Sequence, residues 1–264
     1  MNVSDFLPRT WVFVDVDGGL ASLAALAEVA RIAPGLQAQL REDLAPEWGV
    51  GVDDTVSPGP MTSDAALAAK HCQIQWHAKA PTDAGDAIAI HGVDANGNPI
   101  AHFYADIAQR CNVSPSSCIS HEMLEASADP ECDRVATLPD GRVVAVEICD
   151  AVEAFTYQKL GVEVSAFSLP SNFGIGGNAA PYDSLGKATT QFEVLLGGYA
   201  QVRTADGWQQ LSPGRRCAIG DCCAPAERRT NVCADHRRLG TGHGSYRAAL
   251  DRLGLGRGAR RRAR

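Results

Sequence analysis

The chain has 264 residues, 45% of them hydrophobic and 21% charged, which is the composition of an ordinary globular protein with one large domain or two smaller ones. No run of about 18 apolar residues occurs, so the sequence excludes a membrane-spanning helix of ordinary length. The net charge of −7 combines −16 over residues 1–198 with +9 over residues 199–264, which indicates two modules with different partners.

The first residues lack a basic start followed by an apolar run and a cleavage site, so we expect a cytoplasmic protein without a secretion signal. Where cysteines lie close together near a histidine, metal binding is then more typical than a disulfide. In an exported protein, a Cys111–Cys118 or a Cys132–Cys149 disulfide would remain an alternative. Five of the nine cysteines are scattered, and most of them are expected to be small buried hydrophobic residues: Cys72, Cys111, Cys118, Cys132 and Cys149.

The first half of the chain alternates strand and helix patterns. The alanine and leucine spacing over residues 20–44 predicts two helices or one broken helix, interrupted at Pro34-Gly35. Residues 55–64 are predicted to be a loop around Pro58-Gly59-Pro60, and Asn96-Gly97 predicts a hairpin turn. Strands are predicted over residues 11–16, 50–56, 73–78, 87–93 and 100–107.

A later helix is predicted to begin at Ser114-Pro115, with serine as the N-cap, and to end at Asp129-Pro130. Asp206-Gly207 predicts a hairpin over residues 199–211. The predicted fold class is therefore α+β: a mixed, twisted sheet with an N-terminal helix and a later helix that carries the site. Further strands are predicted over residues 143–148, 162–169 and 192–196.

The later helix carries residues with metal-ligand spacing. His121 and Glu125 are four residues apart, so both lie on one face of the helix and can reach the same metal ion. Glu122 lies where a general base can take a proton from metal-bound water, as in the His-Glu-x-x-His zinc motif with glutamate in place of its second histidine. The third ligand must come from outside the helix, and Glu147 or Asp150 can provide it.

The same residues also fit an ordinary structural role. His-Glu with another glutamate three residues later is common on solvated helix faces. Glu147 and Asp150 would then solvate a strand end or cap a turn. The sequence pattern by itself leaves both interpretations open.

The segment Ser120-His121-Glu122-Met123-Leu124-Glu125-Ala126, followed by Asp129-Pro130, resembles a signature of zincin-like bacterial and phage proteins. These are distantly similar to the plant phosphate-induced (Exordium) proteins. Four further segments fit the bacterial pattern, so that the resemblance spans residues 43–199. They are residues 43–50, 146–153, 161–167 and 197–199.

The resemblance implies a metal-binding, peptidase-like fold that acts on a peptide or protein, without a settled substrate. It implies that His121 and Glu125 are zinc ligands and Glu122 the base, with Glu147 preferred as third ligand and Asp150 as an alternative or a supporting partner. His91 falls where related sequences place a strand histidine, as a ligand, a substrate contact or a structural residue. Asp129 is expected to cap the helix end.

The C-terminal segment carries a second metal-ligand pattern, Cys217 and Cys222 followed by Cys233 and His236. These four residues resemble small zinc modules of phage and actinobacterial proteins, and they predict a closed, structural Zn²⁺ site beside the catalytic one. Cys223 is an alternative to Cys222. So short a module would take most of its folding free energy from the metal.

The arginine-rich end of the chain is expected to be disordered and to hold phosphates, so nucleic acid is the first partner to test, with binding to the acidic domain as the alternative. The predicted domains are residues 1–213 (hydrolase), 214–240 (zinc module) and 241–264 (basic tail). The leading hypothesis is a zinc-dependent peptidase. The alternatives are a metal-stabilised scaffold with a nucleic-acid-binding module and a phage-related, virion-associated or host-interaction factor.

Overall fold

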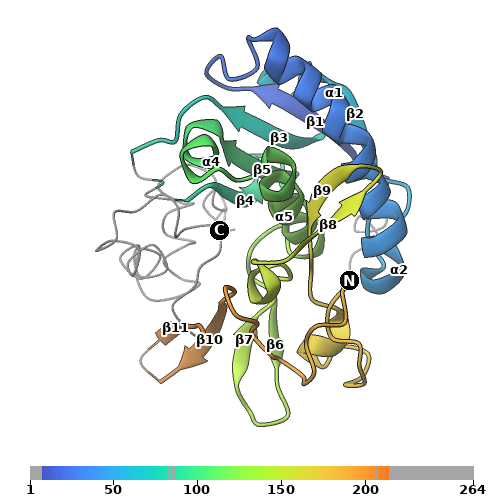
Figure 1. Cartoon of the computed structure of the whole chain (residues 1–264), viewed down its shortest axis with the longest axis vertical. Helices are drawn as coiled ribbons and strands as arrows, with labels where there is room; N and C mark the ends of the chain where they lie inside the picture. Colours follow the sequence, from blue (N-terminus) through green and yellow to red (C-terminus); the bar gives the residue numbers. More distant parts are fainter. Residues whose placement is uncertain (1–7, 83, 85–86, 206, 214–264) are drawn as a thin grey trace, which may run out of the picture.

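The computed structural model describes residues 8–82, 84, 87–205 and 207–213, and these form an α+β fold as predicted. The largest sheet has five strands in the order β2-β1-β3-β5-β4, with β4 antiparallel to β5 and the other neighbours parallel (Figure 1). Its strands are β1 (Thr10–Asp15), β2 (Thr55–Met61), β3 (Cys72–His77), β4 (Ala89–Val93) and β5 (Pro99–Tyr104).

The second strand lies later in the chain than the sequence predicted. Residues 55–64 were expected to form a loop after a strand over residues 50–56, but β2 begins at Thr55 and contains Pro58 and Pro60. Proline cannot donate a ladder hydrogen bond, so in sheets it is confined largely to edge strands. Because β2 is an edge of this sheet, the two prolines are tolerated there.

Helix α1 (Leu23–Ala38) runs through Pro34, so the predicted interruption is wrong. The Pro34 ring is exposed, whereas its neighbours on the other face are buried, and this packing outweighs a local cost of roughly 3 kcal/mol. An added Cβ on Gly35 would lie 2.5 Å from the Val162 Cβ, so this glycine permits close packing. The helix continues as a π-helical segment, η2 (Gln39–Leu44), and as α2 (Ala45–Trp48).

The predicted hairpin at Asn96-Gly97 joins β4 to β5, which is confirmed by their antiparallel pairing. Helix α5 has the bounds Pro115–Ala128, with Ser114 as N-cap and Asp129 as C-cap, as the sequence predicted. It packs against β4, β5 and β9. The remaining helices of this half are α3 (Ser63–Ala68) and α4 (Ala105–Cys111).

The second half of the described chain forms two smaller sheets. The hairpin of β10 (Ala200–Thr204) and β11 (Gly207–Leu211) is confirmed, and β10 pairs with β7 (Val143–Ala145), which pairs with β6 (Val135–Thr137). The strand predicted over residues 192–196 is absent, because that stretch forms turns between η4 and β10. The other elements are β8 (Thr156–Lys159), β9 (Val162–Ser165) and the 3-10 helices η3 (Asp150–Val152) and η4 (Pro170–Phe173).

One large hydrophobic core joins the five-stranded sheet, α1, α5 and the smaller sheets. Trp11, Phe103, Ile119 and Phe167 lie within it and are almost fully buried. Among the described residues, no helix is both long enough and apolar enough to cross a membrane.

Candidate metal centre

Helix α5 is held in the interior by a buried polar network. Ser120 Oγ donates a hydrogen bond to Gln39 Oε1 (2.8 Å) and accepts one from Ser165 N (2.8 Å), while Gln39 Nε2 donates to Ser165 O (2.7 Å). These bonds fix the middle of the helix between η2 and β9. Every residue from Ser116 to Ala128 is buried, so side chains on all faces of α5 meet protein.

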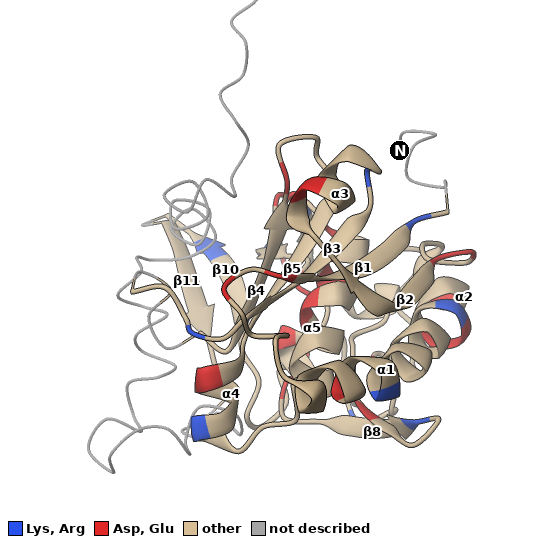
Figure 2. Cartoon of the chain, turned by 90° about the horizontal axis from the view of Figure 1, so that it is seen from above, with Lys and Arg blue, Asp and Glu red and all other residues tan. Residues whose placement is uncertain are grey.

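His121, Glu122 and Glu125 are only 8%, 8% and 3% exposed, so the alternative of a solvated helix face is wrong. Figure 2 shows the acidic positions of α5 surrounded by other elements, with the Lys and Arg positions on the periphery. Burial of a carboxylate is unfavourable unless it is paired or bound to a metal. Within the described ranges, the ion pairs of Glu122, Glu125 and Asp150 are all with histidines.

The first half of the cluster is centred on His121. Its Nε2 lies 3.4 Å from Glu125 Oε2, one helical turn away, and 3.2 Å from Asp150 Oδ1. A single N–H group can align well with only one of these two oxygens. The arrangement therefore gives one imidazole nitrogen facing two carboxylates.

The second half of the cluster is centred on His91, in β4, which is 1% exposed. Its Nδ1 lies 3.2 Å from Glu122 Oε2 and 3.4 Å from Glu125 Oε2. Its Nε2 lies 3.8 Å from Glu147 Oε2 and 3.1 Å from Cys132 Sγ. The strand histidine that the sequence left as a ligand, a substrate contact or a structural residue thus lies within the cluster.

The acidic segment after β7 closes the cluster from the other side. Cys149 N donates a hydrogen bond to Glu125 Oε1 (3.0 Å), which ties this segment to α5, and Ser168 N donates to Ile148 O (2.6 Å). Glu147 and Asp150 are 8% and 5% exposed. The sequence left these two as alternatives for one position, whereas the structure brings Asp150 to His121 and Glu147 to His91.

Burial and mutual repulsion distribute protons unevenly over the cluster. Burial, together with the charge of Glu125, raises the pKa of Asp150 to about 7, and burial raises the pKa of Glu147 well above its usual range. Burial would lower the pKa of His121, but Glu125 and Asp150 outweigh it and raise that pKa. Burial would likewise raise the pKa of Glu125, but His121 and His91 hold it low. The protein by itself therefore neutralises part of this negative charge with protons, which a metal cation would displace.

The donor atoms fit a metal ion. Two overlapping groups each offer three ligand atoms within 4.8 Å of one another: His121, Glu122 and Glu125, and His91, Glu125 and Glu147. Imidazole nitrogen and carboxylate oxygen suit zinc and also harder divalent ions such as manganese. The described residues thus include a candidate metal centre with more donors than one zinc ion requires.

Residues not predicted from the sequence also support the cluster. Cys132 has φ +50° and contacts His91, although it was expected to be an ordinary buried residue. Tyr199 donates a side-chain hydrogen bond to Asp150, and Gly198 packs directly on the Asp150 backbone. The sequence signal for Gly198 and Tyr199 is that residues 197–199 fit the zincin-like pattern.

Asp129 caps the end of α5 as expected, and its carboxylate accepts hydrogen bonds from Asp133 N (3.2 Å) and Arg134 N (2.8 Å). Both disulfides considered from the sequence are absent, because Cys118, Cys132 and Cys149 are free thiols. The predicted zinc ligands Cys217, Cys222, Cys233 and His236, and the domains 214–240 and 241–264, lie outside the described residues.

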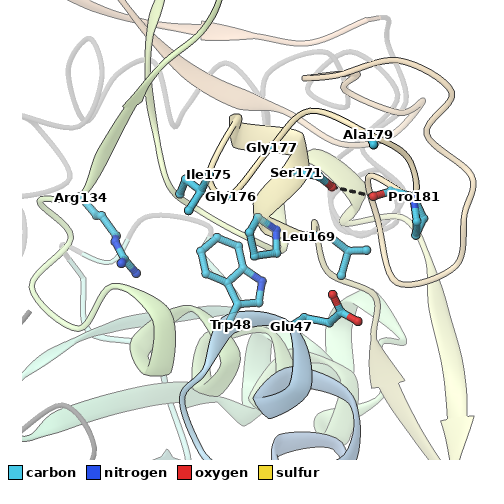
Figure 3. Close-up of a pocket in the computed structure, with 11 residues that line it drawn as sticks. Glu47, Trp48, Arg134, Leu169, Ser171, Ile175, Gly176, Gly177, Ala179 and Pro181 are labelled. Carbon is cyan, nitrogen blue, oxygen red and sulfur yellow. Dashed lines mark hydrogen bonds between the residues drawn. The ribbon is translucent and has the colours of Figure 1, made fainter.

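A pocket of about 490 Å³ lies between Trp48 and the glycine-containing loop after η4 (Figure 3). Trp48 forms its floor, Glu47 and Arg134 lie towards opposite sides, and a glycine-containing loop after η4 forms the far wall. A backbone hydrogen bond joins Arg134 of the pocket to the chain next to Glu147, since Val146 N donates to Arg134 O (3.0 Å). No residue of the cluster lines this pocket.

We compared the chain with protein-family models, with curated proteins and with solved structures, and none of them matches it.

Proposed function

We propose that this protein is a metal-dependent hydrolase, of the zincin peptidase kind, whose metal is held by His121, Glu125 and Asp150. The observation that carries the proposal is the position of His121 Nε2, 3.4 Å from Glu125 Oε2 and 3.2 Å from Asp150 Oδ1. In a tetrahedral zinc site with bonds of about 2.0–2.1 Å, neighbouring ligand atoms are about 3.3 Å apart. Both contacts of His121 Nε2 have about this length, so His121 is spaced as a ligand together with each of these two carboxylates.

The resemblance favours Glu147 as third ligand, but we assign Asp150. Asp150 lies beside His121 and is fixed by its neighbours. Tyr199 bonds to its carboxylate and Gly198 packs on its backbone. Such supporting contacts orient a ligand and tune its metal. When bound, the metal would supply Lewis-acid activation of a water molecule and of the scissile carbonyl.

Glu122 is the proposed general base. Its neighbour in the chain is the ligand His121, and its Oε2 lies 3.2 Å from His91 Nδ1, which orients the carboxylate. Glu122 would accept the proton of the attacking water and pass it to the leaving amine of a peptide or protein substrate. A ligand set of one histidine and two carboxylates cancels the charge of a divalent cation and leaves the water less acidic, so the base matters more here.

The direct test is Glu122→Gln, which keeps the size of the side chain and removes the base. We expect this variant to lose cleavage of a peptide library by about 100-fold or more while it retains its metal, because general-base catalysis contributes about 10²–10⁴-fold. His121→Ala should lose the metal and the activity together. Loss of metal in Glu122→Gln, or unchanged cleavage, would show that the role of Glu122 is wrong.

A second candidate function is a metal-stabilised scaffold whose arginine-rich C-terminus binds nucleic acid. Two observations favour it: the 14 arginines of residues 199–264, and the burial of the cluster away from the pocket. The full chain would then bind DNA with an affinity that falls steeply with salt and is unaffected by Glu122→Gln. We also propose a cytoplasmic location and, with this second candidate function, a phage-related role.

A further inference from the structure

The position of one oxygen atom, Glu125 Oε2, leads beyond a single metal ion. It lies 3.4 Å from His121 Nε2 and also 3.4 Å from His91 Nδ1, so two imidazoles face the same carboxylate oxygen. The other oxygen, Oε1, accepts the hydrogen bond of Cys149 N. Glu125 is thereby held with one oxygen directed at both histidines.

Each histidine has further carboxylates of its own. Asp150 Oδ1 lies 3.2 Å from His121 Nε2, and Glu147 Oε2 lies 3.8 Å from His91 Nε2, whereas Glu125 faces the Nδ1 atom of His91. His91, Glu125 and Glu147 together place ligand atoms within 4.8 Å of one another, and all three are buried. This set contains its own histidine and its own carboxylate and shares only Glu125 with the site of the proposed function.

The charges point in the same direction. Among the described residues, the close charged-group contacts of Glu122, Glu125 and Asp150 are with histidines, and three ionised carboxylates carry more negative charge than one divalent cation offsets. Two divalent ions bridged by a shared ligand lie about 3.5–4 Å apart in two-metal hydrolase sites. A carboxylate oxygen directed at two histidines is suited to such a bridge.

We infer that the cluster is a two-metal centre, in which Glu125 bridges one ion held by His121 and Asp150 and a second ion held by His91 and Glu147. This inference rests on the proposed function for the first ion.

The test uses the full chain, stripped of metal and titrated with Mn²⁺, with bound Mn²⁺ counted by equilibrium dialysis and observed by electron paramagnetic resonance. Mn²⁺ prefers oxygen ligands such as carboxylates to thiolates, so a cysteine-rich site elsewhere in the chain competes poorly for it. We expect two Mn²⁺ per chain and the spectrum of an exchange-coupled pair. His91→Ala should bind one Mn²⁺ with an uncoupled spectrum.

Because His91 is buried and its alanine variant can fail to fold, Glu147→Gln provides a variant of unchanged size, and it should also bind one uncoupled Mn²⁺. His71→Ala, at a partly exposed histidine outside the cluster, is the matched control and should keep both ions. A wild-type chain that saturates at one Mn²⁺, or binds two without coupling, overturns the second site and leaves the proposed function standing. A Glu147→Gln variant that keeps the coupled pair also overturns it, whereas a cluster that binds no metal refutes both proposals.

Discussion

Gly198→Ala tests whether the backbone at Asp150 is held in place by the segment before β10. A Cβ added at Gly198 would lie 2.5 Å from Ala151 O and 2.7 Å from Asp150 O, closer than side chains approach backbone oxygens. Both oxygens are fixed by hydrogen bonds, from Leu195 N to Ala151 O and from Tyr199 N to Asp150 O, each 2.9 Å long. The substitution must therefore displace this backbone, and with it the Asp150 carboxylate.

Overpacking of this kind typically costs about 1–3 kcal/mol of unfolding free energy. Gly59→Ala is the matched control, because no atom lies within 4 Å of its added Cβ. At that position the loss of freedom in the unfolded chain is expected to change stability by no more than about 1 kcal/mol. Urea denaturation of the metal-free proteins measures this difference.

The displaced carboxylate should also weaken metal binding, by about 10- to 100-fold as is usual when support of a ligand is lost. A competitive titration with a coloured chelator measures it on the folded protein. If Gly198→Ala is destabilised but binds metal as tightly as the wild type, Asp150 is not a ligand. If it behaves like Gly59→Ala in both assays, the packing described for residues 197–199 is wrong.

Three further predictions follow from the same geometry. Metal removal by a chelator should lower the free energy of unfolding, by about 2.7 kcal/mol relative to protein at a free metal concentration 100 times its Kd, which paired thermal melts would check. Because the pKa of Asp150 is about 7, it is increasingly protonated below that pH, so metal affinity should fall as pH falls through 7 and metal uptake at pH 6 should release protons, measurable by calorimetry in two buffers. Burial lowers the pKa of His102 to about 3, whereas in the unfolded chain this histidine protonates below about pH 6.5. The contribution of His102 to stability is therefore complete above pH 6.5, and it falls by up to about 1.4 kcal/mol per pH unit below that pH. A His102→Gln variant that folds should show a shallower loss of stability in acid, and an unchanged slope would contradict this assignment.

The elements with strong local patterns were predictable from the sequence. The bounds of α5 follow from Ser114-Pro115 at one end and Asp129-Pro130 at the other, and the β4–β5 turn follows from Asn96-Gly97. The errors fall where tertiary packing decides. Proline usually ends a helix, but α1 continues because the face opposite Pro34 is buried. The two prolines of β2 predict a loop, because the sequence does not show that this strand lies at an edge of the sheet, where proline is tolerated.

The candidate site divides in the same way. The i, i+4 spacing predicts that His121 and Glu125 share a face of α5, and the structure places them 3.4 Å apart. Which carboxylate from outside α5 contacts His121 depends on the turn between β7 and η3. Residue spacing alone therefore does not distinguish Glu147 from Asp150. The role of Cys132 next to His91 depends on a contact across 41 residues, for which a lone cysteine gives no signal.

The burial of the cluster argues for function over stability. Apolar side chains of similar volume in place of a buried charged group are often neutral or stabilising, by about 1–4 kcal/mol. Here two histidines and four carboxylates, from β4, α5 and the segment after β7, are buried next to the large hydrophobic core. If the cluster served only the fold, apolar residues would serve at least as well, so its specific donors favour the proposed cation site. That reasoning predicts a folded and more stable protein when the cluster is replaced by apolar residues of matched volume, with metal binding lost.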